Sequence, residues 1–444
     1  MKQFSYVLGA LVSVAGCAVE PEEELSTERS ELGHAPSIPN NLPMLNELGF
    51  SSTFSLDGRV SFGGKFFADL GTNDRTCGSC HKATEGWTVS TDALQLVFLL
   101  TGGRDPIFRT NDGSNSPHAD VSTVAARRKA YSMLLTRGTI RVGIGMPADA
   151  EFTLEAVDDP YGYASAAELS MFRRPLPAAN LAANPTVMWD GRVTGATLEA
   201  ALAEQANGAT QGHAARPTPL NDATRKAIVD FELALYNAQD FTFGIGQLDV
   251  AGARGSAKLL AEADLRANDD TTGLTPEQII AKRRWDIFDS WKNSSNPKRR
   301  QVYRGQELFN TRSHVPGRPD FTCTNCHTQQ NFGTDIRGRF FNVLDPATKP
   351  LRRAPDQPLY TFRNKTTGAV IQTTDPGRAL ITGKWADMSR FKVPAMRALG
   401  ARAPYFHDGS AKTLRDIVRL YEERQDFDFT PQEEEDLVAF MAAL

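Results

Sequence analysis

The stretch RTCGSCHK occupies residues 75–82, and CTNCH at residues 323–327 repeats its Cys-x-x-Cys-His core in the second half of the chain. In both copies two residues separate the cysteines, and a histidine directly follows the second one. Such a run is the attachment signal for a c-type haem, in which both thiols bond the haem vinyl groups and the histidine ligates the iron. The sequence therefore predicts two covalently bound haems. The predicted cofactor-binding residues are Cys77, Cys80, His81, Cys323, Cys326 and His327.

Cysteine usage supports this prediction. The chain has five cysteines, and four of them fall inside the two runs. The fifth, Cys17, lies near the N-terminus, so no cysteine is left for a disulfide or a separate zinc site. The alternative interpretations are two CxxC pairs that share one zinc ion, or a thioredoxin-like redox pair. The histidine that follows both pairs favours haem attachment.

The first 17 residues predict export. Lys2 carries a positive charge, an apolar stretch runs from Phe4 to Ala15, and VAGC at residues 14–17 places small residues before a cysteine. This run resembles the lipobox of bacterial lipoproteins, in which the cysteine is lipidated and becomes the new N-terminus. The alternative is an ordinary cleaved signal peptide. We therefore expect a protein of the periplasm or cell surface that is anchored to a bacterial membrane through lipid on Cys17.

Length and composition indicate several globular domains. The chain has 444 residues, of which 41% are hydrophobic and 23% are charged. Because the formal net charge is -4, no general basic field is expected, and nucleic acid is not a favoured partner. The predicted organisation is a signal peptide over 1–17, a disordered acidic tether over 18–45, an N-terminal haem domain over 46–245, a connection over 246–294 and a C-terminal haem domain over 295–444.

Helical signals dominate, and clearly alternating strands are scarce, so the predicted fold class is mainly α with long loop-rich connections. Thr197 and either Asn221 or Asp222 are candidate N-caps, and Thr275-Pro276 opens a further helix with proline at its first position. Turn signals are frequent in residues 101–159, which should wrap the first haem edge rather than form a core. Further helices are expected over about 298–309, 412–423 and 430–444.

The sixth ligand of a haem iron decides its function. A second permanent ligand gives an electron-transfer site, whereas an open position gives a site for an oxidant. With His81 and His327 as proximal ligands, the distal candidates include methionines, tyrosines and the histidines His34, His118, His213, His314 and His407. We set His34 aside because it lies in the tether. His118 and His314 lie in proline-rich loops and are expected at the surface.

Four further motifs occur in a fixed order: WDGR at 189–192, EQA at 204–206, FKVP at 391–394 and APYFHDG at 403–409. Together with the haem motifs they resemble the bacterial di-haem cytochrome c peroxidase and MauG family, from about residue 60 to the C-terminus. That family has two cytochrome c-like helical domains. The resemblance implies that hydrogen peroxide is reduced at the N-terminal haem by electrons relayed from the C-terminal haem.

The resemblance leaves the partner open. A small redox protein would supply electrons to a peroxidase, whereas a MauG-like enzyme would use peroxide to oxidise a protein substrate. The alternative class is a non-catalytic di-haem electron carrier. A homodimer is compatible with each of these functions.

The resemblance also assigns roles near the first haem. Trp189 matches a tryptophan between the haems that relays electrons, although a buried tryptophan can simply anchor a turn. Asp190 and Arg192 would brace that turn as a hydrogen-bonded pair. His213 follows the EQA helix where the family places a distal acid or base, usually a glutamate. A histidine there can move a proton between the peroxide oxygens, and the alternatives are reversible ligation or a solvated loop position.

At the second haem the chain departs from the peroxidases. They have a methionine fourteen residues beyond the histidine of PYFH, and counting fourteen from His407 reaches Tyr421, as in MauG-like members. A phenolate is a hard anionic ligand that lowers the reduction potential. The alternative is that Tyr421 is a core aromatic residue and that Met388 or Met396 ligates the iron. His407 would then lie near the same haem without ligating it.

Calcium is doubtful as a cofactor. Family members bind it between the domains through an asparagine and backbone carbonyls. Here Arg174 stands at the matching asparagine position, and Arg402 replaces a threonine. A calcium site needs oxygen ligands, which neither arginine side chain provides.

Overall fold

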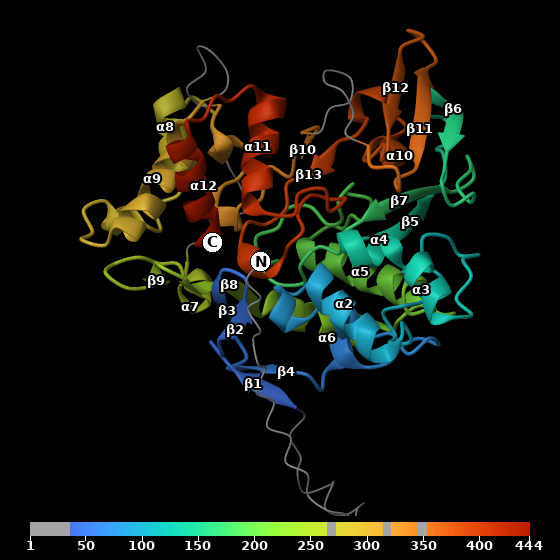
Figure 1. Ribbon diagram of the computed structural model, residues 1–444, viewed down its shortest axis with the longest axis horizontal. Coiled ribbons are helices and arrows are strands. Elements are labelled where there is room, and N and C mark those ends of the chain that lie inside the picture. Colours follow the sequence, from blue (N-terminus) through green and yellow to red (C-terminus); the bar gives the residue numbers. More distant parts are fainter. Residues whose placement is uncertain (1–35, 264–271, 314–320, 344–352) are drawn as a thin grey trace, which may run out of the picture.

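The computed structural model describes residues 36–263, 272–313, 321–343 and 353–444 (Figure 1). Predictions for Cys17, His34 and His314 fall outside these ranges. The helices are α2 (Thr91–Thr101), α3 (Val124–Ala130), α4 (Ser132–Arg137), α5 (Leu198–Gly212), α6 (Asp222–Leu233), α7 (Ala257–Ala261), α8 (Pro276–Arg283), α9 (Pro297–Thr311), α10 (Ala379–Thr382), α11 (Leu414–Gln425) and α12 (Pro431–Ala442). The strands are β1 (Ser37–Pro39), β2 (Met44–Asn46), β3 (Gly49–Ser55), β4 (Arg59–Ser61), β5 (Ile140–Ile144), β6 (Phe152–Asp158), β7 (Leu169–Arg173), β8 (Leu235–Thr242), β9 (Gly246–Gln247), β10 (Phe340–Phe341), β11 (Leu359–Asn364), β12 (Val370–Thr373) and β13 (Phe391–Lys392).

The prediction of a mainly α fold is wrong. Helices account for 34% of the structure and strands for 17%, and the described strands form several small sheets. The largest has the order β2-β3-β8-β9, and another has the order β12-β11-β6. Strands such as β3, with sequence GFSSTFS, bury serine and threonine on both faces. They therefore lack the apolar–polar alternation by which a half-buried strand is recognised in a sequence.

The predicted helix starts are confirmed. Thr197 and Asn221 cap α5 and α6, and each side-chain oxygen accepts a hydrogen bond from a backbone N–H of the first turn. Thr275 forms a capping box with Gln278, and Pro276 is the first residue of α8. These signals depend only on neighbouring residues, which is why the sequence reveals them.

Residues 101–159 are not the coreless loop region that the turn signals predicted. They contain α3, α4, β5 and β6. Phe108, Tyr131 and Leu134 are buried in one cluster, against which Cys80 packs. The many turns therefore connect short elements that enclose the first CxxCH motif with a core of their own.

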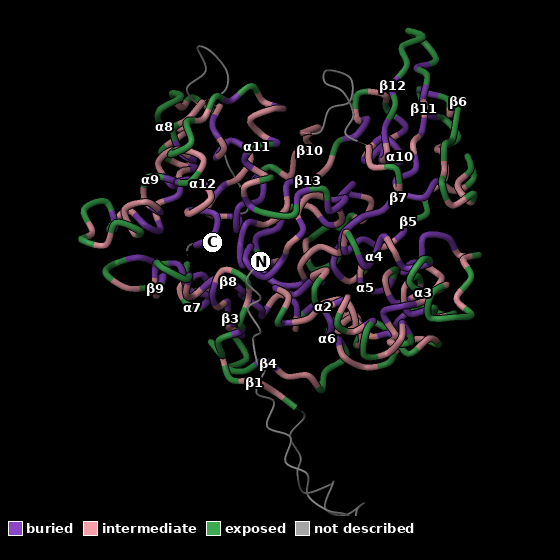
Figure 2. The backbone as a smooth tube through the Cα atoms, viewed as in Figure 1, coloured by how far each residue is buried: buried purple, intermediate pink, exposed green. Residues whose placement is uncertain are grey.

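The two halves of the chain are interlocked. Strand β6 from the first half pairs antiparallel with β11 from the second. At the chain end, the carbonyl of Leu444 accepts hydrogen bonds from the backbone N–H groups of Gln239 in β8 and Ala398. In Figure 1, α8, α9, α11 and α12 gather on one side and α2 to α6 on the other. Figure 2 shows buried backbone concentrated between these groups, whereas the β11–β12 hairpin is largely exposed on its outer residues.

Two predicted connecting ranges carry ordered structure. Residues 36–45 of the expected tether include β1 and the start of β2, and the remainder of that tether lies outside the described ranges. The expected connection over 246–294 includes α7 and α8, and it contributes Trp285, Phe288 and Trp291 to the core around α9 and α12. No helix of the described residues is long and apolar enough to cross a membrane.

Candidate functional site

The two CxxCH motifs fold into the same local structure. Cys77–Ser79 and Cys323–Asn325 each form one turn of 3-10 helix, η2 and η5. In each turn the backbone N–H of the following histidine donates to the carbonyl of the first cysteine, at 2.9 Å for His81 and 3.0 Å for His327. The second cysteine donates to the same carbonyl. Each turn thus places both thiols and the histidine on one short, rigid segment.

Both histidines are oriented in the same way. The Nδ1 atom of His81 lies 2.9 Å from the carbonyl oxygen of Trp87, and that of His327 lies 2.8 Å from the carbonyl oxygen of Gly333. Since a carbonyl oxygen only accepts, Nδ1 carries the proton and Nε2 is left free to bind a metal. Burial lowers the pKa of both imidazoles, which favours the neutral form that ligates iron.

A left-handed turn brings each carbonyl back to its histidine. Gly86 and Trp87 have φ angles of 60° and 61°, and Phe332 and Gly333 have φ angles of 57° and 87°. The accepting residue is the sixth after the histidine in both copies. A glycine five or six positions after each histidine is the sequence signal for this contact, and the CxxCH motif itself does not contain it.

The four thiols of the two motifs are buried and do not converge on a metal site within the described residues. Burial raises the pKa of Cys80 to about 11 and the pKa of Cys77 to about 12. It also raises the pKa of Cys323 and Cys326 to about 12. Without a bound metal the four thiols are therefore protonated. Within the described ranges, no three His, Cys, Asp or Glu side chains converge as a metal site requires.

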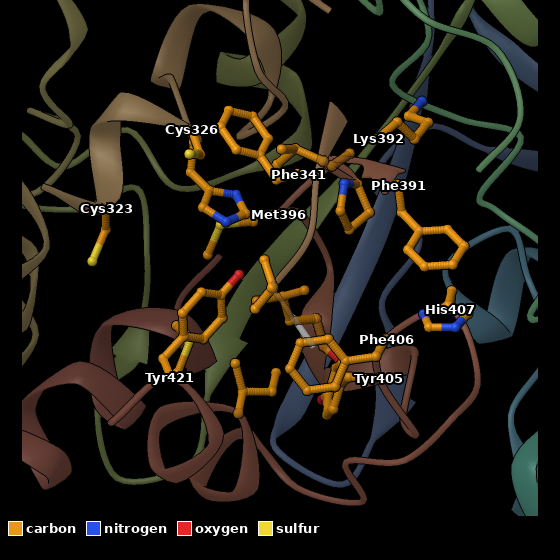
Figure 3. Close-up of a pocket in the computed structure, with 18 of the residues that line it drawn as sticks. Cys323, Cys326, Phe341, Phe391, Lys392, Met396, Tyr405, Phe406, His407 and Tyr421 are labelled. Atoms are coloured by element: carbon orange, nitrogen blue, oxygen red, sulfur yellow. The ribbon is translucent and has the colours of Figure 1, made fainter. Parts of the chain in front are cut away.

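A cavity of about 350 Å³ lies beside the second motif (Figure 3). Its lining includes Cys323, Cys326 and His327, and no aspartate or glutamate of the described chain contributes to it. The walls are mostly apolar and aromatic, with contributions from Phe309, Phe341, Val393, Leu399, Phe406, Val418 and Leu437. Such a cavity, with two thiols and an imidazole in its wall, fits a large apolar group that is attached covalently.

The cavity contains two of the three distal ligands predicted for the second motif, which are Tyr421, Met388 and Met396. Tyr421, on α11, projects into it, and Met396 lines it close to Cys326 (Figure 3). Burial raises the pKa of the Tyr421 phenol, and no hydrogen bond of its hydroxyl is seen among the described residues. Met388 does not line the cavity. It packs in a separate cluster with Tyr360 and Phe362.

His407 and Trp189 also line this cavity. The imidazole of His407 stacks on Phe391 with ring centroids 3.9 Å apart, and it meets the Trp189 ring edge-on at 6.2 Å. The Trp189 indole N–H donates to the carbonyl of Arg174 at 2.8 Å. The guanidinium of Arg174 in turn donates to the carbonyl of Val89, two residues beyond the Trp87 carbonyl that holds His81. Trp189 therefore contacts the second cavity and is connected to the loop that orients His81.

Asp190 is the buried centre of an ion-pair network. Arg192 donates to both of its carboxylate oxygens, at 3.2 and 3.0 Å. Arg173 bridges Asp190 and Asp375. Burial alone would raise the pKa of Asp190, but the two arginines lower it, so the carboxylate stays charged. This network fixes the turn that carries Trp189.

His213 lies beside the first motif as part of a network that the sequence did not reveal. It ends α5, and its Nδ1 atom is hydrogen-bonded to a carboxylate oxygen of Asp112. The other oxygen of Asp112 pairs with the buried guanidinium of Arg75, two residues before Cys77. Burial alone would raise the pKa of Asp112, but His213 and Arg75 lower it. After burial, an electrostatic contribution from His213 also lowers the pKa of His81, so the two histidines lie within electrostatic reach.

The backbone of His213 is held as firmly as its ring. Its carbonyl accepts hydrogen bonds from Asn73 at 2.9 Å, Asn111 at 3.2 Å and Arg75 at 3.3 Å. Asn73 and Arg75 lie just before the first CxxCH motif, and Asn111 lies just before Asp112. The end of α5 is thus fixed to the segment that carries the cysteines. His118, by contrast, is exposed, and its ring packs against Tyr163.

Comparison with known proteins supports the resemblance. No protein-family model matches the chain. Cytochrome c peroxidase Ccp of Escherichia coli (strain K12) is 31% identical over 159 residues, which are 35% of this chain and 28% of that protein. Cytochrome-c peroxidase IdrP2 of Denitromonas iodatirespirans is 31% identical over 133 residues, which are 28% of this chain and 35% of that protein. The chain therefore spans about a third of the length of these curated relatives.

A solved structure of a MauG-like protein associated with microbial copper homeostasis aligns over 93% of each chain, with a TM-score of 0.40 and 16% identity. The curated relatives are bacterial cytochrome c peroxidases, so the resemblance that the motifs predicted is confirmed.

Proposed function

We propose that this chain is an exported di-haem c-type oxidoreductase that reduces hydrogen peroxide. The observation that carries the proposal is the pair of CxxCH turns with the same backbone hydrogen bonds and the same histidine–carbonyl contact. The cytochrome c peroxidase relatives support the same reaction class. The reaction is H₂O₂ + 2 H⁺ + 2 e⁻ → 2 H₂O: the O–O bond breaks, and both electrons come from an external reductant such as a small redox protein.

Each motif would hold one haem. The thiols of Cys77 and Cys80 would bond the first, with His81 as its ligand, and the motif at 323–327 would hold the second in the cavity that Tyr421 lines. Bound haem supplies an iron that changes oxidation state, which peroxide reduction requires. The chain itself contributes a pre-oriented imidazole at each site and a mostly apolar cavity wall at the second.

His213 would move the proton at the peroxide site. Its Nδ1 is engaged by Asp112, so Nε2 is the atom left to accept a proton from one peroxide oxygen and return it to the other. Asp112 would act as a positioning residue, because its carboxylate fixes the ring orientation and stabilises the protonated imidazole. Heterolytic cleavage of the O–O bond needs this transfer, since the departing oxygen leaves as water.

Trp189 would connect the two sites. Its ring lines the second cavity, and its indole N–H is held by the carbonyl of Arg174, whose side chain reaches the loop after His81. The Asp190 network would keep this ring fixed, which an efficient electron relay requires.

A second candidate is a MauG-like oxidation of a protein substrate with peroxide as oxidant. The observation that favours it is the Tyr421 side chain in the second cavity, because a phenolate ligand stabilises oxidised iron. In that case two electrons and two protons leave the protein substrate for each peroxide that is reduced. Peroxide consumption without an added donor, accompanied by a mass loss of two hydrogens in a partner protein, would distinguish this reaction.

The test is steady-state peroxide reduction with a reduced small c-type cytochrome as donor. His213→Gln should lower kcat/KM for peroxide roughly a hundredfold, the order of a general acid–base contribution. His118→Gln is the matched control, because His118 is an exposed histidine that packs on Tyr163, and it should leave the rate unchanged. A wild-type protein that carries both haems and does not turn over peroxide would refute the enzyme and leave an electron carrier.

A further inference from the structure

Two buried arginines, Arg174 and Arg402, lie side by side in the wall of the cavity that holds Cys323 and Cys326. Arg174 is 5% exposed and Arg402 is 8% exposed, and both line the cavity. Nη2 of Arg174 donates to the carbonyls of Val89 at 2.7 Å and of Arg402 at 3.0 Å. Nη2 of Arg402 donates to the carbonyl of Ala395 at 2.6 Å. Backbone carbonyls thus fix both guanidinium groups in place.

These two charges lack a counter-charge in the described chain. Neither guanidinium forms an ion pair with a described carboxylate, and Glu85 acts on Arg174 only at a distance. Burial, followed by the charge of Arg402, lowers the pKa of Arg174 to about 9, and burial lowers that of Arg402 to about 10. The Nε atom of Arg402 is buried without a partner. Two adjacent, uncompensated cations in a protein interior are costly unless an anion joins them.

The fold makes room for both side chains. A Cβ atom at Gly138 would come within 2.1 Å of Nη1 of Arg174, and one at Gly86 would come within 2.6 Å of Cγ of Arg402. Both glycines also have φ near 60°, which disfavours any larger residue. The two arginine side chains therefore fill space that only glycine at positions 86 and 138 leaves open.

We propose that Arg174 and Arg402 form an anion site for the two propionate carboxylates of the haem attached at Cys323 and Cys326. The rest of the lining is mostly apolar and contains no described acidic residue, so the cavity suits a large apolar group with two carboxylates. Guanidinium groups bind carboxylates strongly through charge-assisted hydrogen bonds. These side chains, rather than a bound divalent cation, supply the positive charge at this end of the site. The inference rests on the proposed haem attachment.

Lys392 is the other cation of the cavity wall, and it does not take part. Its ammonium group turns away from the cavity (Figure 3), and it donates to Oδ1 of Asn184 at 2.9 Å and to the carbonyl of Thr186 at 2.6 Å. The anion site therefore consists of the two arginines.

The test is a redox titration of the holoprotein carrying Arg402→Met, Arg402→Lys or Arg174→Met. Loss of one positive charge beside the second haem should shift its reduction equilibrium roughly tenfold or more toward the oxidised form. Arg402→Lys keeps the positive charge, so the reduction potential of its second haem should stay close to that of the wild type. Arg363→Gln is the charge-loss control, because its exposed side chain pairs with Glu155 and does not line the cavity, and it should have little effect. Chelation of calcium should not change the wild-type titration.

The outcomes separate this inference from the proposed function. Haem content, measured as the pyridine haemochrome, reports attachment independently of the redox titration. If the haem is attached and both methionine variants titrate like wild type, the arginine site is refuted while the proposed function stands. If a chelator shifts the wild-type titration as far as the substitutions should, a cation supplies the charge and the inference is equally refuted. If the wild type carries no haem at Cys323 and Cys326, the proposed function itself fails. Should Arg402→Met not accumulate, Arg402→Gln carries the comparison, because its amide can keep the hydrogen bond to Ala395.

Discussion

Glu232 offers a quantitative test of the environment around the first motif. This α6 residue is 6% exposed, and its Oε2 atom has no hydrogen-bond partner. Burial raises the pKa of Glu232 from 4.5 to about 8, and the charge of Glu232 is one of the factors that raise the pKa of Cys77. The carboxyl group is therefore neutral at pH 7, beside the attachment point of the first haem. Glu232→Gln would keep its shape and remove its titration.

The sign and size of the effect follow from proton linkage. Between pH 4.5 and 8 the folded protein binds a proton at Glu232 that the unfolded chain releases, so this carboxyl group destabilises the fold as the pH rises through that window. Since the folded pKa is about 8, the unfolding free energy of the wild type should fall by about 4 kcal/mol relative to Glu232→Gln between pH 5 and pH 9.

Chemical denaturation followed by circular dichroism at a series of pH values measures this difference. Glu199→Gln is the control, because Glu199 is exposed on the first turn of α5 and the backbone hydrogen bond there lowers its pKa. The difference in unfolding free energy between wild type and Glu199→Gln should change little with pH, and in the opposite direction. A wild-type to Glu232→Gln difference that does not change with pH would show that this carboxyl group is ionised and would refute the reasoning.

Four further predictions concern other parts of the chain. Asp112→Asn removes the carboxylate that holds His213, so the first phase of the peroxide reaction in stopped flow should slow roughly tenfold or more; an unaltered rate would contradict the positioning role. Tyr421→Phe should change the electron paramagnetic resonance (EPR) spectrum of the second haem and raise its reduction potential, and an unchanged spectrum would exclude Tyr421 as a ligand. Burial lowers the pKa of Lys392 to about 7, so wild-type stability should rise by about 3 kcal/mol between pH 7 and pH 10 relative to Lys392→Met; denaturation curves that run in parallel would contradict this. Cys17→Ser should abolish labelling of the expressed protein by radioactive palmitate, whereas retained label would exclude Cys17 as the lipidation site.

The features that the sequence predicted correctly are local. The caps Thr197, Asn221 and Thr275 each accept a hydrogen bond from the backbone N–H three residues further along the chain. A short motif contains all the information that such features need. The sequence also predicts correctly that Tyr421 lies on a helix, α11. This prediction is local too, because only one turn and the start of that helix separate Tyr421 from His407.

The features that were missed depend on pairing across the chain. Strands β6 and β11 pair although about 200 residues separate them. Both strands alternate apolar and polar residues, as in Phe152–Glu155 and Tyr360–Arg363, but this alternation does not tell which strand pairs with which. Asp112 reaches His213 over 101 positions, and Arg174 reaches Arg402 over 228. Asp112, Arg174 and Arg402 do not belong to short motifs whose function can be recognised in the sequence. Their chemistry arises only when the fold brings them together.

The EPR spectrum of the ferric protein, recorded before and after addition of one equivalent of hydrogen peroxide, tests the central claim most directly. Two haems in unequal environments should give two distinct ferric signals, because Tyr421 and Met396 line the second cavity while His213 lies within electrostatic reach of His81 in the first motif. Peroxide should change the signals within the reaction time, and His213→Gln should slow that change. Two low-spin signals that peroxide leaves untouched would contradict the account and identify an electron carrier.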